Sequence, residues 1–388
     1  MQSSPQMSIS AKKRRVIFAL YSGLFIVLSP IFLAYTAGIR WTPALGFVKT
    51  GTFYVASTPS GAKISVNGKN TGEKTPSVLK HILPGTYDIA LEKDNAITWS
   101  KKLPIRSGET TFVNDAYLFK KDAPELVVQA KIDEVAFGDD TVAWTTVQSG
   151  WREVWLSEIS NPRKILVYRS AAKSRLGLRF KDRILIVGEG EADGILSFNS
   201  NGTPASYKPI LVFVNRKNRT DVYGSDETNK APALSLPSGN WNEADERNDI
   251  VIATDKRRVR LAVIDSRQKT ILLQTAASLF DFANDDILLF ASDTELSMFN
   301  IPQNKVSLIE RFSSPPTRIQ IHQTGNLILL ESDGVITAIE TDERDGKRKT
   351  ELVSGFSVIG FSIGDSGRTL YIAGSYGTDE GIFVKPLY

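Results

Sequence analysis

The chain has 388 residues, 41% of them hydrophobic and 23% charged, which is ordinary for a folded protein and leaves room for two or three domains. Its 47 Lys and Arg exceed its 43 Asp and Glu by four, and the basic residues 12–15 account for that excess, so no nucleic-acid-binding face is expected. The sequence lacks cysteine and has two histidines, which excludes disulfides and a Cys nucleophile and leaves little for a metal site.

The first predicted element is a transmembrane helix over residues 16–39, which contain no charged side chain. At 1.5 Å per residue this run reaches roughly 36 Å, enough to cross a lipid bilayer despite Pro30. A cleaved secretory signal is the alternative. It fits less well, because its apolar core spans about 7–15 residues and because bulky Tyr35 stands third before a cut after Ala37.

The basic residues 12–15 set the expected orientation. By the positive-inside rule, residues 1–15 form a short cytoplasmic tail, and everything after Trp41 lies outside the cytoplasm. An exported chain without disulfides fits a bacterial surface better than a eukaryotic secreted protein. The predicted location is therefore a bacterial cell membrane, with a single span and the bulk of the chain extracytoplasmic.

Residues 51–118 predict a small β domain. Phe53 and Val55, and later Ile64 and Val66, alternate with polar or small residues, as in half-buried strands, and the Asn-Gly pair at 67–68 is a strong hairpin signal. The motifs PxGA at 59–62, NG at 67–68, TP at 75–76 and LPGxY at 83–87 follow in order. The matching residues are Val55, Pro59, Gly61, Ala62, Ile64, Val66, Asn67, Gly68, Gly72, Thr75, Pro76, Leu83, Pro84, Gly85, Tyr87 and Trp99.

This segment resembles the PEGA domain, a small β-sandwich of bacterial and archaeal surface proteins. Ser60 stands where the family has the Glu of its name, and residues 94–96 stand where a Gly-Tyr pair is usual. The resemblance implies a stalk or adhesive spacer without enzymatic activity. The residues agree, because the polar ones are turn formers and no nucleophile–base arrangement is visible. His81 is most simply a loop or strand-end residue.

Residues 125–388 carry short apolar runs separated by turns, with almost no helical period, which predicts a sandwich, barrel or propeller. A loose repeat of strand, Asp/Gly turn and strand favours a β-propeller, and its copy at 361–368 resembles the turn of TolB- and WD40-like propellers. Blades of about 40–45 residues give about six. The polar stretch 215–248 is expected to be an inserted loop.

The candidate binding residues are aromatic, and most of them cluster early in the propeller region. We expect them to form either an aromatic platform for a glycan or peptide or packing between blades, which is the commoner use of aromatic side chains in such folds. Those in the polar stretch would instead mark a binding loop, or a decorative insertion. The candidates are Trp144, Trp151, Trp155, Tyr223 and Trp241.

Two further patterns favour structural interpretations. Residues 364–367 read GDSG, as around a trypsin-like nucleophile, but neither His81 nor His322 lies in a matching motif, and the repeat explains the tetrapeptide as a turn. The acidic residues Asp342, Glu343 and Asp345 lack the alternating ligands of a calcium loop and adjoin basic residues, so a solvated turn is expected. No catalytic residue, cofactor or metal site is predicted.

The sequence thus predicts a non-catalytic extracytoplasmic binding or scaffold protein, in which a PEGA spacer displays a propeller that recognises an envelope protein or polysaccharide. The alternative is an envelope hydrolase or lyase with its active site on one propeller face, because fold alone does not exclude catalysis. A sensor is a third hypothesis, but the predicted tail over 1–15 is too short to fold.

Overall fold

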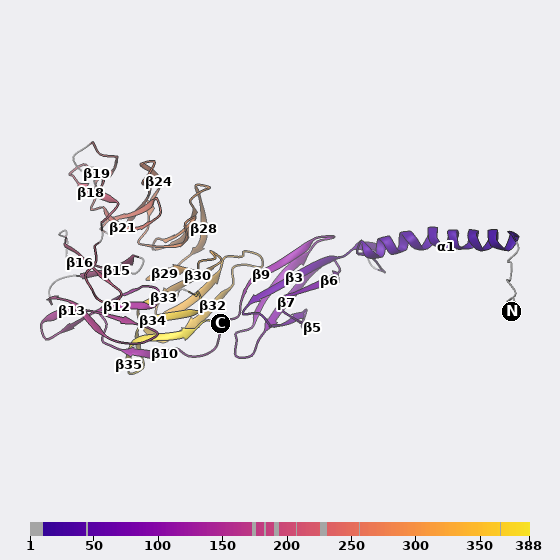
Figure 1. Ribbon diagram of the computed structural model, residues 1–388, viewed down its shortest axis with the longest axis horizontal. Coiled ribbons are helices and arrows are strands. Elements are labelled where there is room, and N and C mark those ends of the chain that lie inside the picture. The colour runs from indigo at the N-terminus through magenta and orange to yellow at the C-terminus, as the bar shows by residue number, and fades with distance from the viewer. Residues whose placement is uncertain are drawn as a thin grey trace, which may run out of the picture. The chain divides into compact units, whose positions relative to one another are not determined.

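The computed structural model describes residues 11–43, 46–172, 176–181, 184–189, 194–206, 208–225, 231–255, 257–364 and 366–388. The chain divides into two compact units, residues 1–118 and 119–388 (Figure 1). Apart from one N-terminal helix, the regular elements of the described residues are strands. The all-β prediction with a single N-terminal apolar helix is confirmed.

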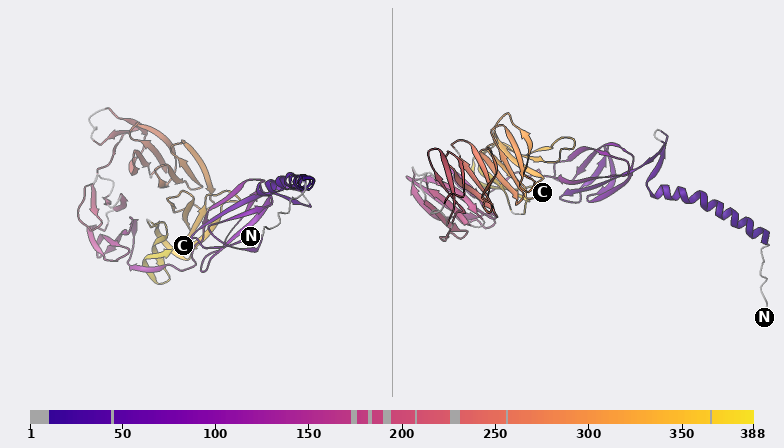
Figure 2. Two further views of the ribbon diagram at one scale, coloured as in Figure 1. Left: turned by 45° about the vertical axis from the view of Figure 1, so that its right-hand side comes forward. Right: turned by 90° about the horizontal axis from the view of Figure 1, so that it is seen from above.

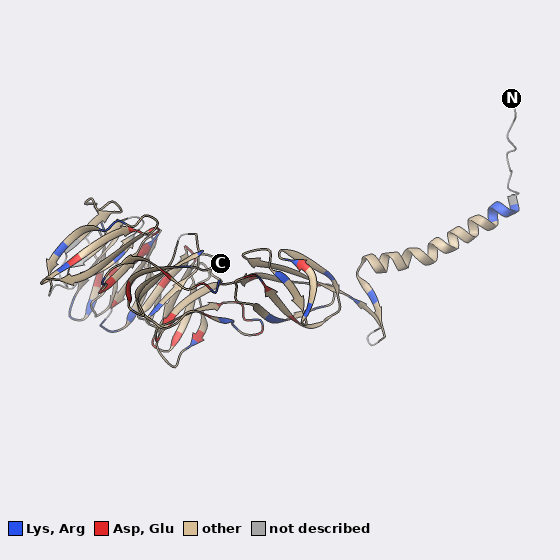
Figure 3. Cartoon of the chain, turned by 90° about the horizontal axis from the view of Figure 1, so that it is seen from below, with Lys and Arg blue, Asp and Glu red and all other residues tan. Residues whose placement is uncertain are grey.

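The helix α1 spans Ala11–Thr36 and includes Pro30. Within it, Lys12–Thr36 is long and apolar enough to cross a membrane, and its side chains are not buried against the rest of the protein. Figure 3 shows the basic residues at its N-terminal end and none of either charge along the rest. The helix begins at Ala11, before the predicted residue 16. It ends at Thr36, before the predicted residue 39, because Gly38 turns the chain at a φ of +82°.

A short hairpin follows the helix. Its strands are β1 (Ile39–Thr42) and β2 (Gly46–Lys49), paired antiparallel.

The rest of the first unit is a two-sheet β-sandwich. One sheet has the order β6-β3-β9, in which β3 pairs antiparallel with β6 and parallel with β9, and the other has the order β5-β4-β7-β8. Their strands are β3 (Gly51–Thr58), β4 (Lys63–Val66), β5 (Lys69–Lys74), β6 (Ser77–Ile82), β7 (Gly85–Glu92), β8 (Trp99–Ile105) and β9 (Thr110–Tyr117). The alternating residues Phe53, Val55 and Ile64 point into one buried core with Trp99.

The loop at 94–96 replaces the usual Gly-Tyr pair without disturbing this core. Asn95 adopts a φ of +57°, which asparagine tolerates better than most side chains, and Ala96 packs into the core. The departure from the family pattern is therefore absorbed locally.

The described strands of the second unit form seven antiparallel sheets arranged in a ring, which is a β-propeller (Figure 2). Blade 1 combines β10 (Glu125–Gln129) with β33 (Phe356–Ile363), β34 (Thr369–Tyr376) and β35 (Asp379–Pro386). Blade 2 has β11 (Glu134–Phe137), β12 (Thr141–Gln148), β13 (Trp151–Glu158) and β14 (Ile165–Ala171). Blade 3 has β15 (Leu176–Lys181), β16 (Ile184–Glu189) and β17 (Gly194–Asn199), and blade 4 has β18 (Leu211–Asn215), β19 (Arg219–Gly224) and β20 (Leu234–Pro237).

The remaining blades have four strands each. Blade 5 has β21 (Asn242–Arg247), β22 (Ile250–Asp255), β23 (Arg260–Asp265) and β24 (Thr270–Ala276). Blade 6 has β25 (Leu279–Asn284), β26 (Ile287–Ala291), β27 (Glu295–Asn300) and β28 (Lys305–Arg311). Blade 7 has β29 (Arg318–Ile321), β30 (Leu327–Ser332), β31 (Val335–Glu340) and β32 (Lys349–Val353). Apolar clusters fill the spaces between blades 1 and 2, between blades 2 and 3, and between blades 6 and 7.

Two sequence expectations need correction. The ring has seven blades rather than about six, because blades 3 and 4 have three described strands each and take up fewer residues than the assumed repeat. The stretch 215–248 is not an inserted loop, since it contains the whole of β19, β20 and β21. Its polar residues belong to strands whose inward positions are still apolar, with Val222 and Leu236 buried in the core between blades 4 and 5.

The ring is closed by pairing between its two ends. Strand β10, at the start of the unit, pairs antiparallel with β35, at its end, so that Leu126 lies opposite Phe383. At this seam Gly381 lies against β10, where a Cβ atom would stand 2.0 Å from the carbonyl oxygen of Val128.

We therefore expect Gly381→Ala to destabilise the propeller by about 1–3 kcal/mol, the usual cost of overpacking. Gly177→Ala is the matched control, because a Cβ at Gly177 meets no atom within 4 Å. Urea denaturation of the full chain in detergent, followed by circular dichroism, measures both. Equal midpoints for the two variants would contradict the tight fit at the seam.

Candidate functional site

Three of the five predicted binding residues are buried. Trp144 lies in the core between blades 1 and 2, and Trp241 in the core between blades 4 and 5. The Trp241 Nε1 donates to the Pro237 carbonyl at 2.8 Å, and the Arg260 guanidinium lies 4.9 Å from its ring centroid. Tyr223 is also buried. These three side chains therefore pack the propeller and present no ring face to a ligand.

The other two lie on one face of β13. Trp155 is opposite Trp144 of β12 and half-buried against the same core, whereas Trp151 begins the strand next to the turn at 148–150 and is 49% exposed. Residues two apart on a strand share a face, so Glu153 lies between the two tryptophans on that face. Of the predicted residues, Trp151 is thus the one with a large accessible aromatic surface.

Glu153 fixes the side chains around it. Its buried carboxylate accepts from Nη2 of Arg169, on β14, at 2.5 Å and from Nε1 of Trp155 at 3.2 Å. The Arg169 guanidinium lies 6.0 Å from the Trp151 ring centroid, and its side chain is half-exposed. We call Trp151, Glu153, Trp155 and Arg169 the Trp151 array.

The Trp151 array has the chemistry of a recognition surface. An exposed indole offers a flat apolar face, and a guanidinium held by a buried carboxylate offers oriented hydrogen-bond donors. Tryptophan and arginine are also the residue types most enriched among binding hot spots. Glu153 and Arg169 are not among the residues predicted from the sequence. The alternation of Trp, Glu and Trp at 151, 153 and 155 could have indicated Glu153, because alternate residues of a strand share a face. Arg169 becomes a neighbour only through the pairing of β13 with β14.

A second polar region lies where the first strands of blades 2 to 7 converge with β33 of blade 1. Partly buried side chains there bond to backbone groups of other blades. The bridges run from Leu211 N to Glu243 Oε2 at 3.1 Å, from Arg179 Nη1 to the Ala244 carbonyl at 2.7 Å, from Ile321 N to Asp281 Oδ2 at 2.7 Å, and from Ile363 N to Gln320 Oε1 at 2.6 Å. These bonds satisfy backbone groups that the edges of neighbouring sheets leave unpaired.

Asp281 is the electrostatically unusual member of this region. Although the residue as a whole keeps some exposed surface, desolvation of its carboxyl raises its pKa to about 7. The negative charge of Asp245 raises the pKa further, while the Ile321 N–H and the Arg247 guanidinium act in the opposite direction.

A second buried carboxyl belongs to blade 7. Glu331 lies opposite Arg318 in the pairing of β29 with β30 and accepts from the Gly334 N–H at 2.8 Å. Burial raises the pKa of Glu331 and lowers the pKa of Arg318, since each charged form loses solvent.

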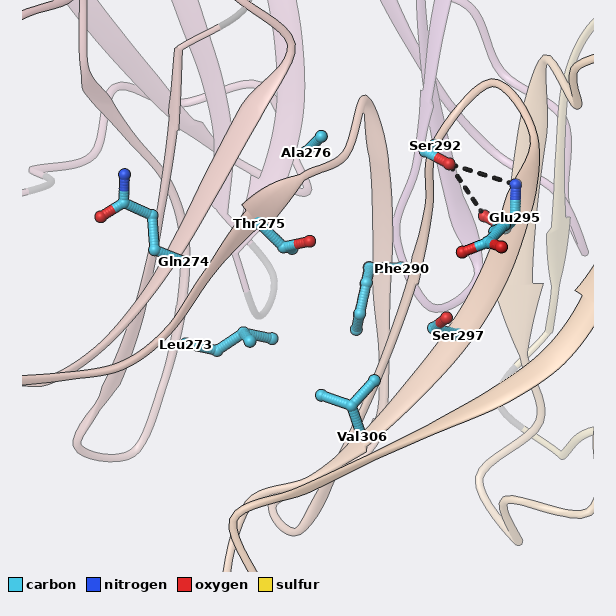
Figure 4. Close-up of a pocket in the computed structure, with 9 residues that line it drawn as sticks. All are labelled: Leu273, Gln274, Thr275, Ala276, Phe290, Ser292, Glu295, Ser297 and Val306. Carbon is cyan, nitrogen blue, oxygen red and sulfur yellow. Dashed lines mark hydrogen bonds between the residues drawn. The ribbon is translucent and has the colours of Figure 1, made fainter.

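A pocket of about 200 Å³ lies between blades 5 and 6 (Figure 4). Its lining combines the apolar Leu273, Phe290 and Val306 with the polar Ser292 and Glu295. Pockets that hold drug-sized ligands span roughly 300–1,000 Å³. This one is too small for such a ligand, and the Glu295 carboxylate is already paired with Arg311 at 3.0 Å.

The structure brings His322 close to Gly367 and Tyr388, which the sequence did not predict, while Asp365 of the GDSG motif lies outside the described residues. The imidazole Nδ1 accepts from the Thr324 N–H at 3.3 Å, and Nε2 lies 3.4 Å from the Tyr388 hydroxyl, which itself donates to the Gly367 carbonyl at 2.5 Å. Both ring nitrogens of His322 are thus within hydrogen-bond distance of groups near Gly367 and Thr324.

The acidic turn at 342–345 pairs its carboxylates with nearby cations. Asp342 binds Arg344 at 2.9 Å, and Glu343 binds Lys347 at 2.8 Å. Among the described residues, no group of three or more His, Asp or Glu side chains is arranged to hold a metal ion.

His81, the other histidine of the chain, lies on β6, and its Nδ1 is 3.2 Å from Arg40 Nη2.

Comparison with known proteins identifies the first β unit. Residues 50–116 match the PEGA domain family, so this segment is a PEGA domain, as its motifs indicated. The chain therefore combines an apolar N-terminal helix, a PEGA domain and a seven-sheet propeller. No curated protein sequence matches the chain.

Solved structures similar to the chain include propellers of the WD40 type. A chain of the mitotic checkpoint complex is 12% identical with a TM-score of 0.48, over 70% of this chain and 98% of that one. The WD40 domain of Toxoplasma gondii coronin is 13% identical with a TM-score of 0.46, over 68% and 86%. An oligogalacturonate lyase in complex with manganese is 6% identical with a TM-score of 0.48, over 69% and 96%. The propeller assignment here rests on the sheet order and ring closure of the chain itself.

The raised pKa of Asp281 predicts a pH-dependent stability. Between about pH 4 and pH 7 the folded protein keeps a proton on Asp281 that the unfolded chain has released, so the free energy of unfolding falls as the pH rises through this window. Asp281→Asn cannot ionise, and its amide oxygen can still accept from Ile321. We expect this variant to gain stability relative to the wild type as the pH rises from 4 to 7.

Urea denaturation of the full chain in detergent at several pH values measures this difference. Asp293→Asn, which removes an exposed carboxylate from the same blade, is the control for loss of charge. A stability difference between Asp281→Asn and the wild type that stays constant with pH would show that Asp281 has an ordinary pKa.

Proposed function

We propose that this protein is a non-catalytic, membrane-anchored binding protein of the bacterial cell envelope, in which a PEGA spacer and a propeller lie outside the cytoplasm. The observation that carries the proposal is α1, whose apolar side chains stay unburied over the length of a membrane span in a chain whose other units are β domains. Such a surface is stable in lipid and costly in water.

The orientation follows from charge. Residues 12–15 are all basic and lie at the start of α1, and basic residues next to a span stay in the cytoplasm. The PEGA domain and the propeller then lie on the opposite side of the membrane. The family resemblance to spacers of surface proteins is consistent with this placement.

The Trp151 array is the proposed recognition surface of the propeller, and its ligand is an envelope protein or polysaccharide. Both ligand classes offer apolar faces for an indole and acceptors for a guanidinium. The charges of both signs on the propeller argue for recognition by shape and hydrogen bonding rather than by a strong field (Figure 3).

A hydrolase or lyase remains the second candidate, favoured by the proximity of the Asp245 and Asp281 carboxyls and the near-neutral pKa of Asp281. Against it, the Asp281 carboxyl already accepts from the Ile321 N–H, which holds blades 6 and 7 together. A hydrolase would lose its turnover in Asp281→Asn, whereas a binding protein would keep its affinity.

The orientation can be tested with single cysteines, because the chain has none of its own. Ser8→Cys precedes the helix, and Lys69→Cys places a thiol on the exposed strand β5. We expect a membrane-impermeant maleimide to label Lys69→Cys in intact spheroplasts and Ser8→Cys only after lysis. The reverse pattern would overturn the orientation, and protection of both thiols would place the bulk of the chain in the cytoplasm.

The recognition surface can be tested by substituting Trp151→Ala in the full chain held in nanodiscs. Purified envelope proteins and envelope polysaccharides are offered separately, and the dissociation constant is measured for whichever binds. Loss of a hot-spot side chain costs about 2 kcal/mol, so we expect Trp151→Ala to raise Kd by about 30-fold.

Tyr376→Ala is the matched control, because Tyr376 is a similarly exposed aromatic residue (46%) on blade 1, outside the array. Equal affinities of the wild type and Trp151→Ala would remove the array from the recognition surface. Equal losses in both variants would indicate general damage to the propeller.

A further inference from the structure

The hairpin after α1 carries two unusually exposed aromatic side chains. Phe47 is 81% exposed and Trp41 is 64% exposed, and outside the helix they exceed every other large apolar side chain of the described residues, the next being Phe112 at 52%. Trp41 of β1 and Phe47 of β2 are direct partners in the antiparallel pairing. Partners of this kind point to the same face, so the two rings form one apolar patch.

The hairpin is joined to the end of α1 without a flexible linker. The Gly38 N–H donates to the Tyr35 carbonyl at 3.2 Å, which completes the last turn of the helix. The Gly38 carbonyl then accepts from both the N–H and the hydroxyl of Thr50, at 2.9 and 2.8 Å, which closes the base of the hairpin. The aromatic patch therefore begins five residues after the last residue of the helix.

Arg40 reinforces this junction from the other face of β1. Its Nη1 donates to the Tyr35 carbonyl at 2.8 Å, its guanidinium lies 3.7 Å from the Tyr35 ring centroid, and its Nη2 lies 3.2 Å from His81 Nδ1. A cation at the C-terminal end of a helix satisfies carbonyls that lack intrahelical partners. Neighbouring residues on a strand point in opposite directions, so Arg40 leaves Trp41 free to face outward.

The charge of this region favours a lipid headgroup surface. None of the first 72 residues is Asp or Glu, whereas Arg40 and Lys49 flank the aromatic pair along the hairpin. Bacterial membranes carry anionic headgroups, which attract basic residues and repel carboxylates. Tryptophan and other aromatic rings near the ends of membrane spans concentrate at the level of these headgroups.

We propose that the β1–β2 hairpin is a second membrane-contacting element, with Trp41 and Phe47 inserted at the headgroup level of the leaflet in which α1 ends. This inference rests on the proposed membrane anchoring by α1 and adds to it a contact outside the helix. Inserted in this way, the hairpin restrains the base of the PEGA domain through the Arg40–His81 and Thr50–Gly38 contacts. The aromatic pair thereby couples the spacer to the membrane surface.

Spin labelling tests the proposal in the full chain, reconstituted in vesicles of phosphatidylethanolamine and phosphatidylglycerol. A nitroxide is attached to Phe47→Cys and, in a second variant, to Trp41→Cys. Collisions with oxygen, which partitions into lipid, are compared with collisions with a water-soluble nickel complex present on both sides of the bilayer. We expect an oxygen-to-nickel ratio severalfold higher at both positions than at an exposed aromatic position of the PEGA domain, Phe112→Cys.

Ile26→Cys, within α1, reports on the anchor itself. A lipid-like ratio at Ile26 together with aqueous ratios at both hairpin positions would overturn the inference and leave the anchor intact. An aqueous ratio at Ile26 would instead refute the proposed anchoring. Dipolar broadening between labels at Phe47 would show that a second copy of the chain, rather than lipid, covers the patch, and this too would overturn the inference.

Discussion

The propeller depends on the pairing of β10 with β35, which joins the first strand of the second unit to its last. An open row of sheets leaves unpaired N–H and C=O groups at each end, and closure removes those edges. The fit is close, because the carbonyl of Val128 approaches Gly381 so nearly that no side chain fits between them. Blade 1 is therefore completed only when both ends of the unit are in place, whereas each of the other blades is built from consecutive strands.

Within the ring, charged and polar side chains serve two different purposes. Where the first strands converge, Glu243, Asp281 and Gln320 accept hydrogen bonds from backbone groups of other blades, and the shifted pKa of Asp281 is a consequence of that burial. On the outer part of blade 2, Glu153 instead orients Arg169 beside an exposed tryptophan. The same residue types thus bridge neighbouring blades in one place and orient an exposed arginine beside an exposed tryptophan in the other.

The first unit presents its apolar surface differently. The PEGA sandwich buries the aromatic residues Phe53 and Trp99 in a single core. The helix and the hairpin after it leave theirs outside, where burial requires lipid or a partner. Arg40 links the exposed helix to the PEGA domain, since its side chain contacts the Tyr35 carbonyl at the helix end and the PEGA residue His81.

The sequence by itself determined the elements that depend on local pattern: the apolar helix, the strands with alternating residues such as Phe53 and Val55, and the turns of the PEGA motifs. It also indicated a propeller, because strand-length runs with Asp/Gly turns recur along the second unit. The blade count, the strands within 215–248 and the roles of the tryptophans were decided by the tertiary structure. Trp144 and Trp151 are the same residue type seven positions apart, yet one packs between blades and the other faces solvent. Burial, and a partner such as Arg169, arise from the pairing of strands and the packing of blades distant in sequence, so no local pattern specifies them.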